Sequence, residues 1–210
     1  MSNSWMILAI GFLAQGFFSA RILVQWFLSE RARKVLSPSI FWILSIVGSY
    51  LLCLYGWLRD DFSIVMGQFL SYYIYLWNLK LKGVWGKVPL VGKAVLVLTP
   101  IVAIGFAADN AMAVYERLLC NEKVPLPLLL WGSAGQILFT MRFVYQWAYS
   151  CRHGESRLPT GFWLISLVGS LSIVSYGVMR SDLVLMVGQS FGVVAYIRNL
   201  MLIKNEKNRK

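Results

Sequence analysis

Acidic residues, histidine and cysteine are scarce in this chain. Of its 210 residues, nine are Asp or Glu, one is His and three are Cys. Paired catalytic carboxylates, a His-based nucleophile relay and a structural metal centre each need more such residues, at matched positions. The cysteines Cys53, Cys120 and Cys151 fall at three different predicted depths, so no disulfide is expected. The sequence therefore predicts that the chain is not an enzyme and holds no metal or cofactor.

The N-terminus also lacks the basic segment that opens a cleavable signal peptide, and Arg21 interrupts the first apolar run. Long apolar runs are abundant: the chain is 58% hydrophobic, with a mean hydropathy of +0.63. A membrane-crossing helix needs about 20 residues. Runs near this length lie at 5–28, 39–58, 62–82, 93–108, 126–149, 160–179 and 183–203. The sequence predicts an all-α integral membrane protein with seven transmembrane helices, of which 93–108 is the shortest.

The two ends of the chain are repeats of one another. Residues 7–82 align with 128–203 without a gap, and about a third of the aligned pairs are identical. Each copy holds three apolar runs, so the run at 93–108 must return the chain before the second copy begins. We expect a 3+1+3 arrangement of parallel repeats related by an axis along the membrane normal, as in some transporters. The predicted divisions are 1–82 (first repeat), 83–125 (linker with the fourth helix), 126–203 (second repeat) and 204–210 (basic tail).

Positive charge is distributed unevenly over the predicted loops. The net charge of +11 could suggest nucleic-acid binding. If the loops alternate between the two sides of a membrane, however, thirteen Lys and Arg fall on one side and four on the other. The positive-inside rule then places the N-terminus outside and the C-terminus in the cytoplasm. This distribution predicts a membrane protein with no nucleic-acid partner.

A polar stripe follows the first helix of each repeat. Its members recur at helical spacing on one face and are identical in the two copies, whereas flanking positions differ. Polar groups at membrane depth are tolerated where they face a bundle interior. We therefore expect the stripe to line a cavity between the repeats. Its candidate substrate-binding residues are Gln15, Arg21 and Gln25, matched by Gln136, Arg142 and Gln146.

The two arginines in this stripe have no acidic residue near their predicted depth. A guanidinium there costs several kcal/mol unless it is paired. A phosphate or diphosphate would suit the forked geometry of both side chains. Two alternatives stay open: structural hydrogen bonds to glutamines or carbonyl groups, and anchoring to lipid phosphates at the inner surface.

Further polar positions recur on the other helices. The third helix of each repeat adds candidates that could line a pore or link helices: Gln68, Tyr75 and Asn78, matched by Gln189, Tyr196 and Asn199. Arg198 stands where the first copy has Trp77, and we expect it to make the site asymmetric. The turns at Arg59–Asp61 and Arg180–Asp182 predict a salt bridge within each turn, or secondarily a gate.

Together these motifs resemble the lipid A biosynthesis N-terminal domain family. The resemblance rests on an R-x-x-x-Q-W helix followed by P-x-x-F-W, present in both copies at Arg21–Trp26 and Pro38–Trp42 and at Arg142–Trp147 and Pro159–Trp163. That domain is similar to the PQ-loop and SWEET superfamily of three-helix repeats. The resemblance implies the bacterial inner membrane and a pathway of lipid A or lipid-linked sugars, often near polyprenyl-phosphate glycosyltransferases.

Two functions follow from these expectations. The first is a transporter or flippase of a phosphate-bearing glycolipid, such as a polyprenyl-phosphate-sugar or a lipid A precursor. The alternative is a membrane partner of a lipid-linked glycosyltransferase that transports nothing. A SWEET-like carrier of a small sugar is a lesser alternative, since two buried arginines fit a neutral cargo poorly.

Overall fold

The chain folds into a bundle of α-helices. The structure, a computed structural model, describes residues 2–110, 112, 115 and 125–208. Seven α-helices occupy this part of the chain, at the seven places that the sequence predicts, and α2 and α7 have the predicted ends. Their bounds are α1 (Ser2–Ala32), α2 (Ser39–Leu58), α3 (Phe62–Leu81), α4 (Leu90–Asp109), α6 (Leu126–His153), α7 (Thr160–Met179) and α8 (Leu183–Lys207), with a 3-10 turn, η1 (Trp85–Lys87).

Matching residues begin the corresponding helices of the two repeats. Pro38 and Pro159 precede α2 and α7 in an extended conformation, which suits a residue without an amide hydrogen at a helix start. Asp61 caps α3 by accepting from the amide of Ile64. Asp182 caps α8 in the same way. Such caps satisfy amides that the first helical turn leaves without partners.

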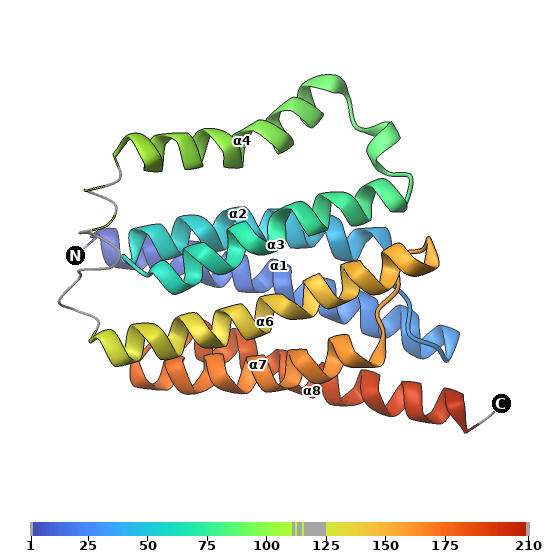
Figure 1. The fold of residues 1–210 in the computed structure, drawn as a ribbon. Helices are drawn as coiled ribbons and strands as arrows, with labels where there is room; N and C mark the ends of the chain where they lie inside the picture. Colours follow the sequence, from blue (N-terminus) through green and yellow to red (C-terminus); the bar gives the residue numbers. More distant parts are fainter. Residues whose placement is uncertain (1, 111, 113–114, 116–124, 209–210) are drawn as a thin grey trace.

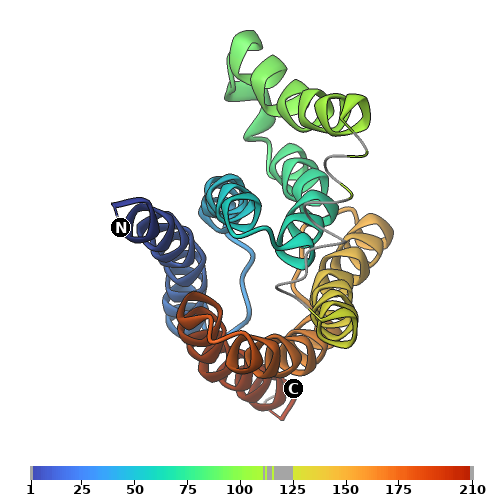
Figure 2. The same ribbon diagram turned by 90° about the vertical axis from the view of Figure 1, so that its left-hand side faces the viewer.

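Six of the helices form a closed ring. Going round it, each helix contacts the next in the order α1, α2, α3, α6, α7, α8, and α8 contacts α1 again. Figure 2, which looks along the bundle, shows this ring with α4 outside it, beside α3. The hydroxyl groups of Tyr72 and Tyr73 on α3 donate to carbonyl groups of α4, at 2.8 and 3.3 Å. The ring is therefore built from the two repeats, and α4 is peripheral to it.

Helix direction alternates along the chain. In Figure 1, α1, α3, α6 and α8 run from left to right, and α2, α4 and α7 return. The left side is called the N-terminal end of the bundle and the right side the C-terminal end. Both triplets, α1–α3 and α6–α8, thus start at the N-terminal end. Their superposition by rotation about a membrane normal stays a prediction.

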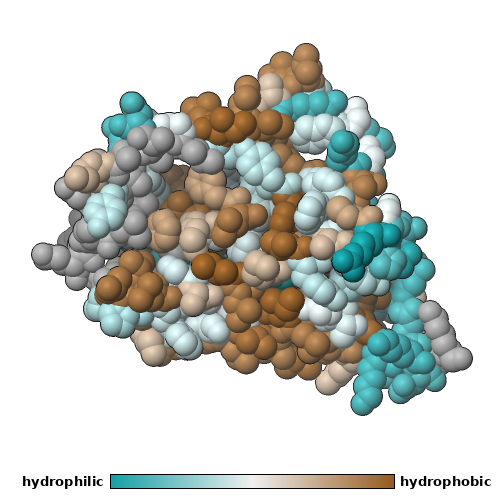
Figure 3. All heavy atoms as spheres, in the orientation of Figure 1, coloured by the Kyte–Doolittle hydropathy of each residue, from teal (hydrophilic) through white to brown (hydrophobic). Residues whose placement is uncertain are grey.

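Four helices are long and apolar enough to cross a membrane: Trp5–Ala32, Ser39–Leu58, Thr160–Met179 and Leu183–Lys207. They indicate a multi-pass membrane protein. Crossing by α3, α4 and α6 stays a prediction, since α3 and α6 carry polar residues that lower their hydropathy. Hydrophobic side chains gather across the middle of the face in Figure 3, and hydrophilic ones gather at the C-terminal end.

Aromatic side chains fill the middle of the ring. Phe143 of α6 packs edge-on against Trp42, Tyr75 and Phe162, with ring centroids 6.3, 4.8 and 5.5 Å away. Edge-to-face aromatic pairs contribute about 0.5–1.5 kcal/mol each beyond the area they bury. Phe143 thereby joins helices of both repeats and forms one wall of the central site.

Candidate functional site

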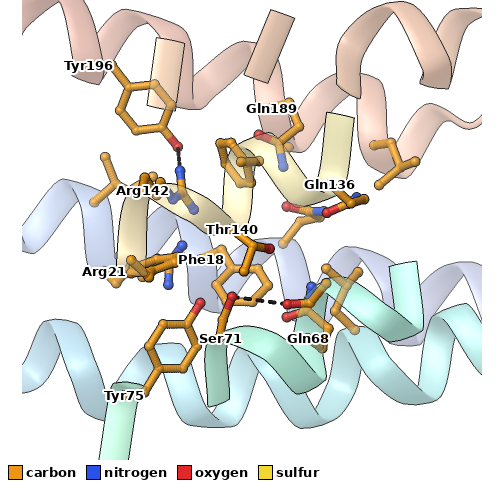
Figure 4. A pocket seen from close by; sticks show the side chains of 18 residues that line it. Phe18, Arg21, Gln68, Ser71, Tyr75, Gln136, Thr140, Arg142, Gln189 and Tyr196 are labelled. Carbon is orange, nitrogen blue, oxygen red and sulfur yellow. Dashed lines mark hydrogen bonds between the residues drawn. The ribbon is translucent and has the colours of Figure 1, made fainter. Parts of the chain in front are cut away.

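A small polar cavity lies in the middle of the ring. Its volume of about 30 Å³ is enough for one or two water molecules. Five of the six ring helices, all except α7, contribute to its lining, and Figure 4 labels side chains from α1, α3, α6 and α8. Eight of the twelve predicted binding residues line it: Gln15, Arg21, Gln68, Tyr75, Gln136, Arg142, Gln189 and Tyr196. The cavity contains no carboxylate, histidine or cysteine among its lining residues.

Arg21 enters this cavity from α1 with 4% of its surface exposed. Its Nη1 donates to Ser45 Oγ at 2.7 Å, and its guanidinium carbon lies 4.4 Å from the ring centroid of Phe18. Ser45 is a neutral acceptor, and its own hydroxyl donates to the carbonyl of Phe41. Arg21 is therefore held by one neutral acceptor and aromatic faces, with no counter-ion in the described part of the chain.

Arg142 enters from α6, where it occupies the position equivalent to Arg21, and it is 2% exposed. Its Nη1 donates to Tyr196 Oη at 3.2 Å, the bond drawn in Figure 4. Its guanidinium carbon stacks 3.3 Å from the centroid of Phe139. Both guanidinium carbons also lie near the ring of Phe143, at 5.6 Å for Arg21 and 4.5 Å for Arg142. The structure thus brings the two cations together, as the sequence comparison of the repeats anticipated.

Three buried donors facing this region have no hydrogen-bond partner within the described chain. They are Nε of Arg21, Nε of Arg142 and Nε2 of Gln15. An unpaired buried donor costs about 1–3 kcal/mol, and more when the group is charged. Cation–π contact with the phenylalanines offsets part of this cost, by about 0.5–2 kcal/mol for each arginine. The cavity therefore presents two cations and three free donors, an arrangement that favours an anion with several acceptor oxygens.

Two glycines give the cavity glutamines their positions. A Cβ atom at Gly67 of α3 would lie 2.8 Å from Oε1 of Gln136. A Cβ atom at Gly188 of α8 would overlap the side chain of Gln15. Each glutamine thus crosses directly over the backbone of a helix from the other repeat, which only glycine permits at such closeness. This contact gives a physical reason for the Gly-Gln pair in both copies.

The other four predicted binding residues lie away from the cavity, toward the C-terminal end. Gln25 of α1 donates to Asn199 of α8 at 2.9 Å, and Gln146 of α6 donates to Asn78 of α3, also at 2.9 Å. All four are fully buried. They join the repeats to each other in two symmetric pairs, and the structure does not bring them to the site.

At the N-terminal end the arginines and aspartates pair between the repeats. Arg59 lies 3.4 Å from Asp182, and Arg180 lies 3.7 Å from Asp61. The predicted salt bridge within each turn is therefore wrong. Each aspartate caps its own helix, which turns its carboxylate toward the opposite repeat instead of toward the arginine two residues before it. A gating role for these pairs stays a prediction.

Two tyrosines that are identical in both copies, and that were not among the predicted site residues, complete this end. Tyr55 donates to Asp182 at 2.9 Å, and Tyr176 donates to Asp61 at 2.7 Å. Their identity in both copies was the available signal. Other cavity-lining residues, such as Ser71 and Thr140, differ between the copies, so a comparison of repeats could not find them.

Arg198 does not line the cavity, contrary to expectation. Its Nη2 donates to Glu30 of α1 at 3.2 Å, and its Nε contacts the same carboxylate. Trp26 donates to this carboxylate as well, at 2.9 Å. Arg198 thus makes the rim between α1 and α8 asymmetric, while the cavity keeps two matched arginines.

Comparison with known proteins gives the same two-copy pattern. The Lipid A Biosynthesis N-terminal domain matches residues 10–80 and again 131–201. The lipid-A-disaccharide synthase of Chlamydia felis (strain Fe/C-56) is 29% identical over 203 residues, covering 92% of this chain and 32% of the synthase. That of Chlamydia pneumoniae is 29% identical over 210 residues, covering 97% and 34%. The chain thus spans about a third of the length of these relatives, and no solved structure matches it significantly. With two matches that together cover more than half of its length, the chain belongs to the Lipid A Biosynthesis N-terminal domain family.

Proposed function

We propose that this chain binds the head group of a phosphate-bearing lipid between its two repeats and moves it across the membrane. The observation that carries the proposal is the pairing of Arg21 and Arg142, both buried, without a carboxylate in the cavity and each with an unpaired Nε. A phosphate monoester or diester offers several anionic oxygens for such donors. Membership in a family tied to lipid A biosynthesis favours a lipid A precursor or a polyprenyl-phosphate-sugar as cargo. No catalytic role is proposed.

The site must widen to accept such a group. A volume of about 30 Å³ holds a water or two, so a phosphate requires the helices to move apart. Polar contacts close the ring on both sides of the cavity, the Arg–Asp pairs at one end and the Gln–Asn pairs at the other. For the proposed transporter this would be a closed form, with polar contacts between the repeats on both sides of the cavity.

The experiment that tests binding is native mass spectrometry of the full chain purified in mild detergent. The purified chain should retain phosphate-bearing lipid through detergent exchange, and added polyprenyl phosphate should compete with it. Diacylglycerol, which has similar tails and no phosphate, should not compete. Equal retention of both lipids would show that the chain binds the apolar lipid tails and does not recognise the phosphate group. That result would contradict the proposal.

The proposed orientation places the N-terminal end of the bundle outside the bacterial inner membrane. The basic residues near the C-terminal end would then lie in the cytoplasm, as the positive-inside rule requires. Cys151, near the end of α6, is exposed in the structure. In a variant that keeps this cysteine alone, a maleimide that cannot cross membranes should label it after permeabilisation and not in intact cells.

A matched variant that keeps only Cys120 supplies the control. Cys120 lies outside the described residues, and the sequence predicts that it faces outward, so the same reagent should reach it in intact cells. Labelling of Cys151 in intact cells would reverse the proposed orientation.

A second candidate function is that of a membrane partner for a lipid-linked glycosyltransferase, without transport. The observation that favours it is the length of the relatives: proteins named lipid-A-disaccharide synthase contain a region like this chain within chains about three times as long. A separate chain could hold such an enzyme at the bilayer in the same way. Stable co-purification with a glycosyltransferase, combined with no lipid movement in vesicles, would favour this function. A carrier of small neutral sugars explains the two buried cations least well.

A further inference from the structure

The ring of six helices closes at two seams where different repeats meet. One lies between α1 and α8 and the other between α3 and α6. Because residues 7–82 align with 128–203, each residue of one seam has a counterpart in the other. The two seams could therefore be chemically equivalent. They differ at both ends of the bundle: at each end the α1–α8 seam has the more exposed arginine or the ion pair, and the α3–α6 seam has more buried or apolar counterparts.

At the C-terminal end, the α1–α8 seam is held by an ion pair. Arg198 of α8 binds Glu30 of α1, and both side chains are partly exposed, at 42% and 34%. The counterparts in the α3–α6 seam are Trp77 and Cys151, and there Trp77 packs edge-on against Trp147, with centroids 6.1 Å apart. A lipid phosphate can replace a carboxylate as the partner of an arginine, because both anions accept two parallel hydrogen bonds. The tryptophan pair offers no such exchange.

At the N-terminal end, the α1–α8 seam is hollowed. A pocket of about 240 Å³ lies there, lined by Ile7 and Leu8 of α1, Leu183 of α8 and the Arg59–Asp182 pair. The Arg59 side chain is 33% exposed, and its Nε has no hydrogen-bond partner among the described residues. Apolar walls beside a partly free guanidinium match an amphiphile with a phosphate head.

The same end of the α3–α6 seam is more tightly closed. Arg180, the counterpart of Arg59, is only 11% exposed. Leu129, the counterpart of Leu8, is buried, and the larger Phe62 stands in place of Leu183. Figure 2 shows α4 beside α3 outside the ring, whereas no described helix lies outside α1 and α8. The α1–α8 seam therefore has the more exposed arginine, and no described helix lies beside its outer face.

From these differences we infer that the α1–α8 seam is a lateral portal for the phosphate-bearing lipid, and that the α3–α6 seam stays shut. The inference rests on the proposed function and adds the path by which the lipid head group would enter the ring from the bilayer. Arginines occupy three levels of the bundle on this side. Arg59 lies at the N-terminal end of the seam and Arg198 at its C-terminal end, and Arg21 and Arg142 lie between these levels in the central cavity. The head group passes between them while the lipid tails remain in the bilayer, so their apolar surface never has to enter the polar cavity.

Photolabelling tests the route directly. The full chain is placed in lipid nanodiscs with a polyprenyl phosphate that carries a diazirine in the isoprene unit next to the phosphate. The label should fall on peptides of α1 and α8 around Ile7, Leu8 and Leu183. Labelling of their counterparts Leu128, Leu129 and Phe62 should be at least about fivefold weaker, because only one seam admits the anionic head. A diacylglycerol with the same diazirine should show no such preference.

A pair of matched variants adds an independent measurement. Arg198→Trp gives the portal the residue of the opposite seam and should reduce labelling of α1 and α8 about tenfold, since it removes a bidentate anion partner. Trp77→Leu, in the shut seam, should leave labelling unchanged. Thermal unfolding in detergent checks that both variants remain folded. If Arg198→Trp does not fold, the labelling pattern of the unaltered chain decides.

Equal labelling of the two seams, labelling chiefly of α3 and α6, or labelling no stronger than with diacylglycerol would each overturn the portal. The pattern reports where the lipid sits and needs no transport. If α1 and α8 are labelled while the chain moves no lipid in vesicles, the proposed transport fails and the portal stands as a binding groove.

Discussion

The double variant Arg21→Gln/Arg142→Gln should lose movement of a polyprenyl-phosphate-sugar across reconstituted vesicles, falling by about 100-fold or to background. This change corresponds to roughly 2.7 kcal/mol, the scale expected for losing charge-assisted hydrogen bonds to one anion. Both side chains lie in the central cavity with an unpaired Nε. Glutamine keeps the stem up to the position of Nε and a polar end, so the variant removes the charge and the outer part of each guanidinium.

Folding should survive this change. Removing two buried cations that have no counter-ion among the described residues relieves a desolvation cost of several kcal/mol. That gain offsets the lost cation–π contacts, which contribute about 0.5–2 kcal/mol each. The matched control is Arg33→Gln, which removes an exposed positive charge near the C-terminal end and should leave lipid movement unchanged.

The single lysine variants separate charge from geometry. Arg21→Lys and Arg142→Lys keep the cation but lose the planar fork, so each should retain only part of the activity. Undiminished lipid movement by the double glutamine variant would refute the phosphate site. That outcome would favour the second candidate function, a membrane partner of a glycosyltransferase, in which the two arginines have a structural role.

Asp182→Ala should produce a large loss of stability, although the residue lies outside the cavity. This carboxylate accepts from Tyr55, pairs with Arg59 and caps α8 through the amides of Val184 and Leu185. Loss of a helix cap costs about 0.5–2 kcal/mol, and loss of hydrogen bonds to a charged group costs about 1.5–3 kcal/mol. We expect the free energy of unfolding to fall by about 2–4 kcal/mol, because parts of these costs overlap.

Reversible unfolding in mixed micelles measures this change. Tyr55→Phe removes one of the bonds and keeps the ring, so it should cost about 1 kcal/mol. Asp109→Ala, at an exposed position at the end of α4, should change stability by less than about 0.5 kcal/mol. A loss below 0.5 kcal/mol for Asp182→Ala would show that the contact between repeats at this end contributes little to the fold.

The places of the helices were determined by the sequence alone. Long apolar runs leave a chain in a bilayer few options other than helices, and Pro38, Pro159, Asp61 and Asp182 mark helix starts through local backbone chemistry. The membership of Gln15, Arg21, Gln136 and Arg142 in one site was also predictable. Helical periodicity sets their shared face, and their identity in the two copies distinguished that face from its surroundings.

The tertiary structure decided which polar residues of that stripe meet which partners. Gln15 and Gln25 share a helix face and differ only in depth; the helix opposite each determines its role. Gly188 leaves room for Gln15 at the cavity, whereas Asn199 engages Gln25 in a buried pair. The stripe by itself contains no information about these opposing residues, because they come from the other end of the chain.

The pairing of Arg59 with Asp182, and the unequal seams, also depended on the three-dimensional arrangement. The sequence places Arg59 two residues from Asp61, and proximity along the chain favoured that pair. The fold instead brings Arg59 to Asp182, because each aspartate is already oriented by capping its helix. The repeats predict two equivalent seams; single differences such as Glu30 for Cys151 and Arg198 for Trp77 become meaningful only when α1 lies against α8. Both the Arg59–Asp182 pairing and the difference between the seams result from packing between segments far apart in the sequence, which local sequence patterns do not determine.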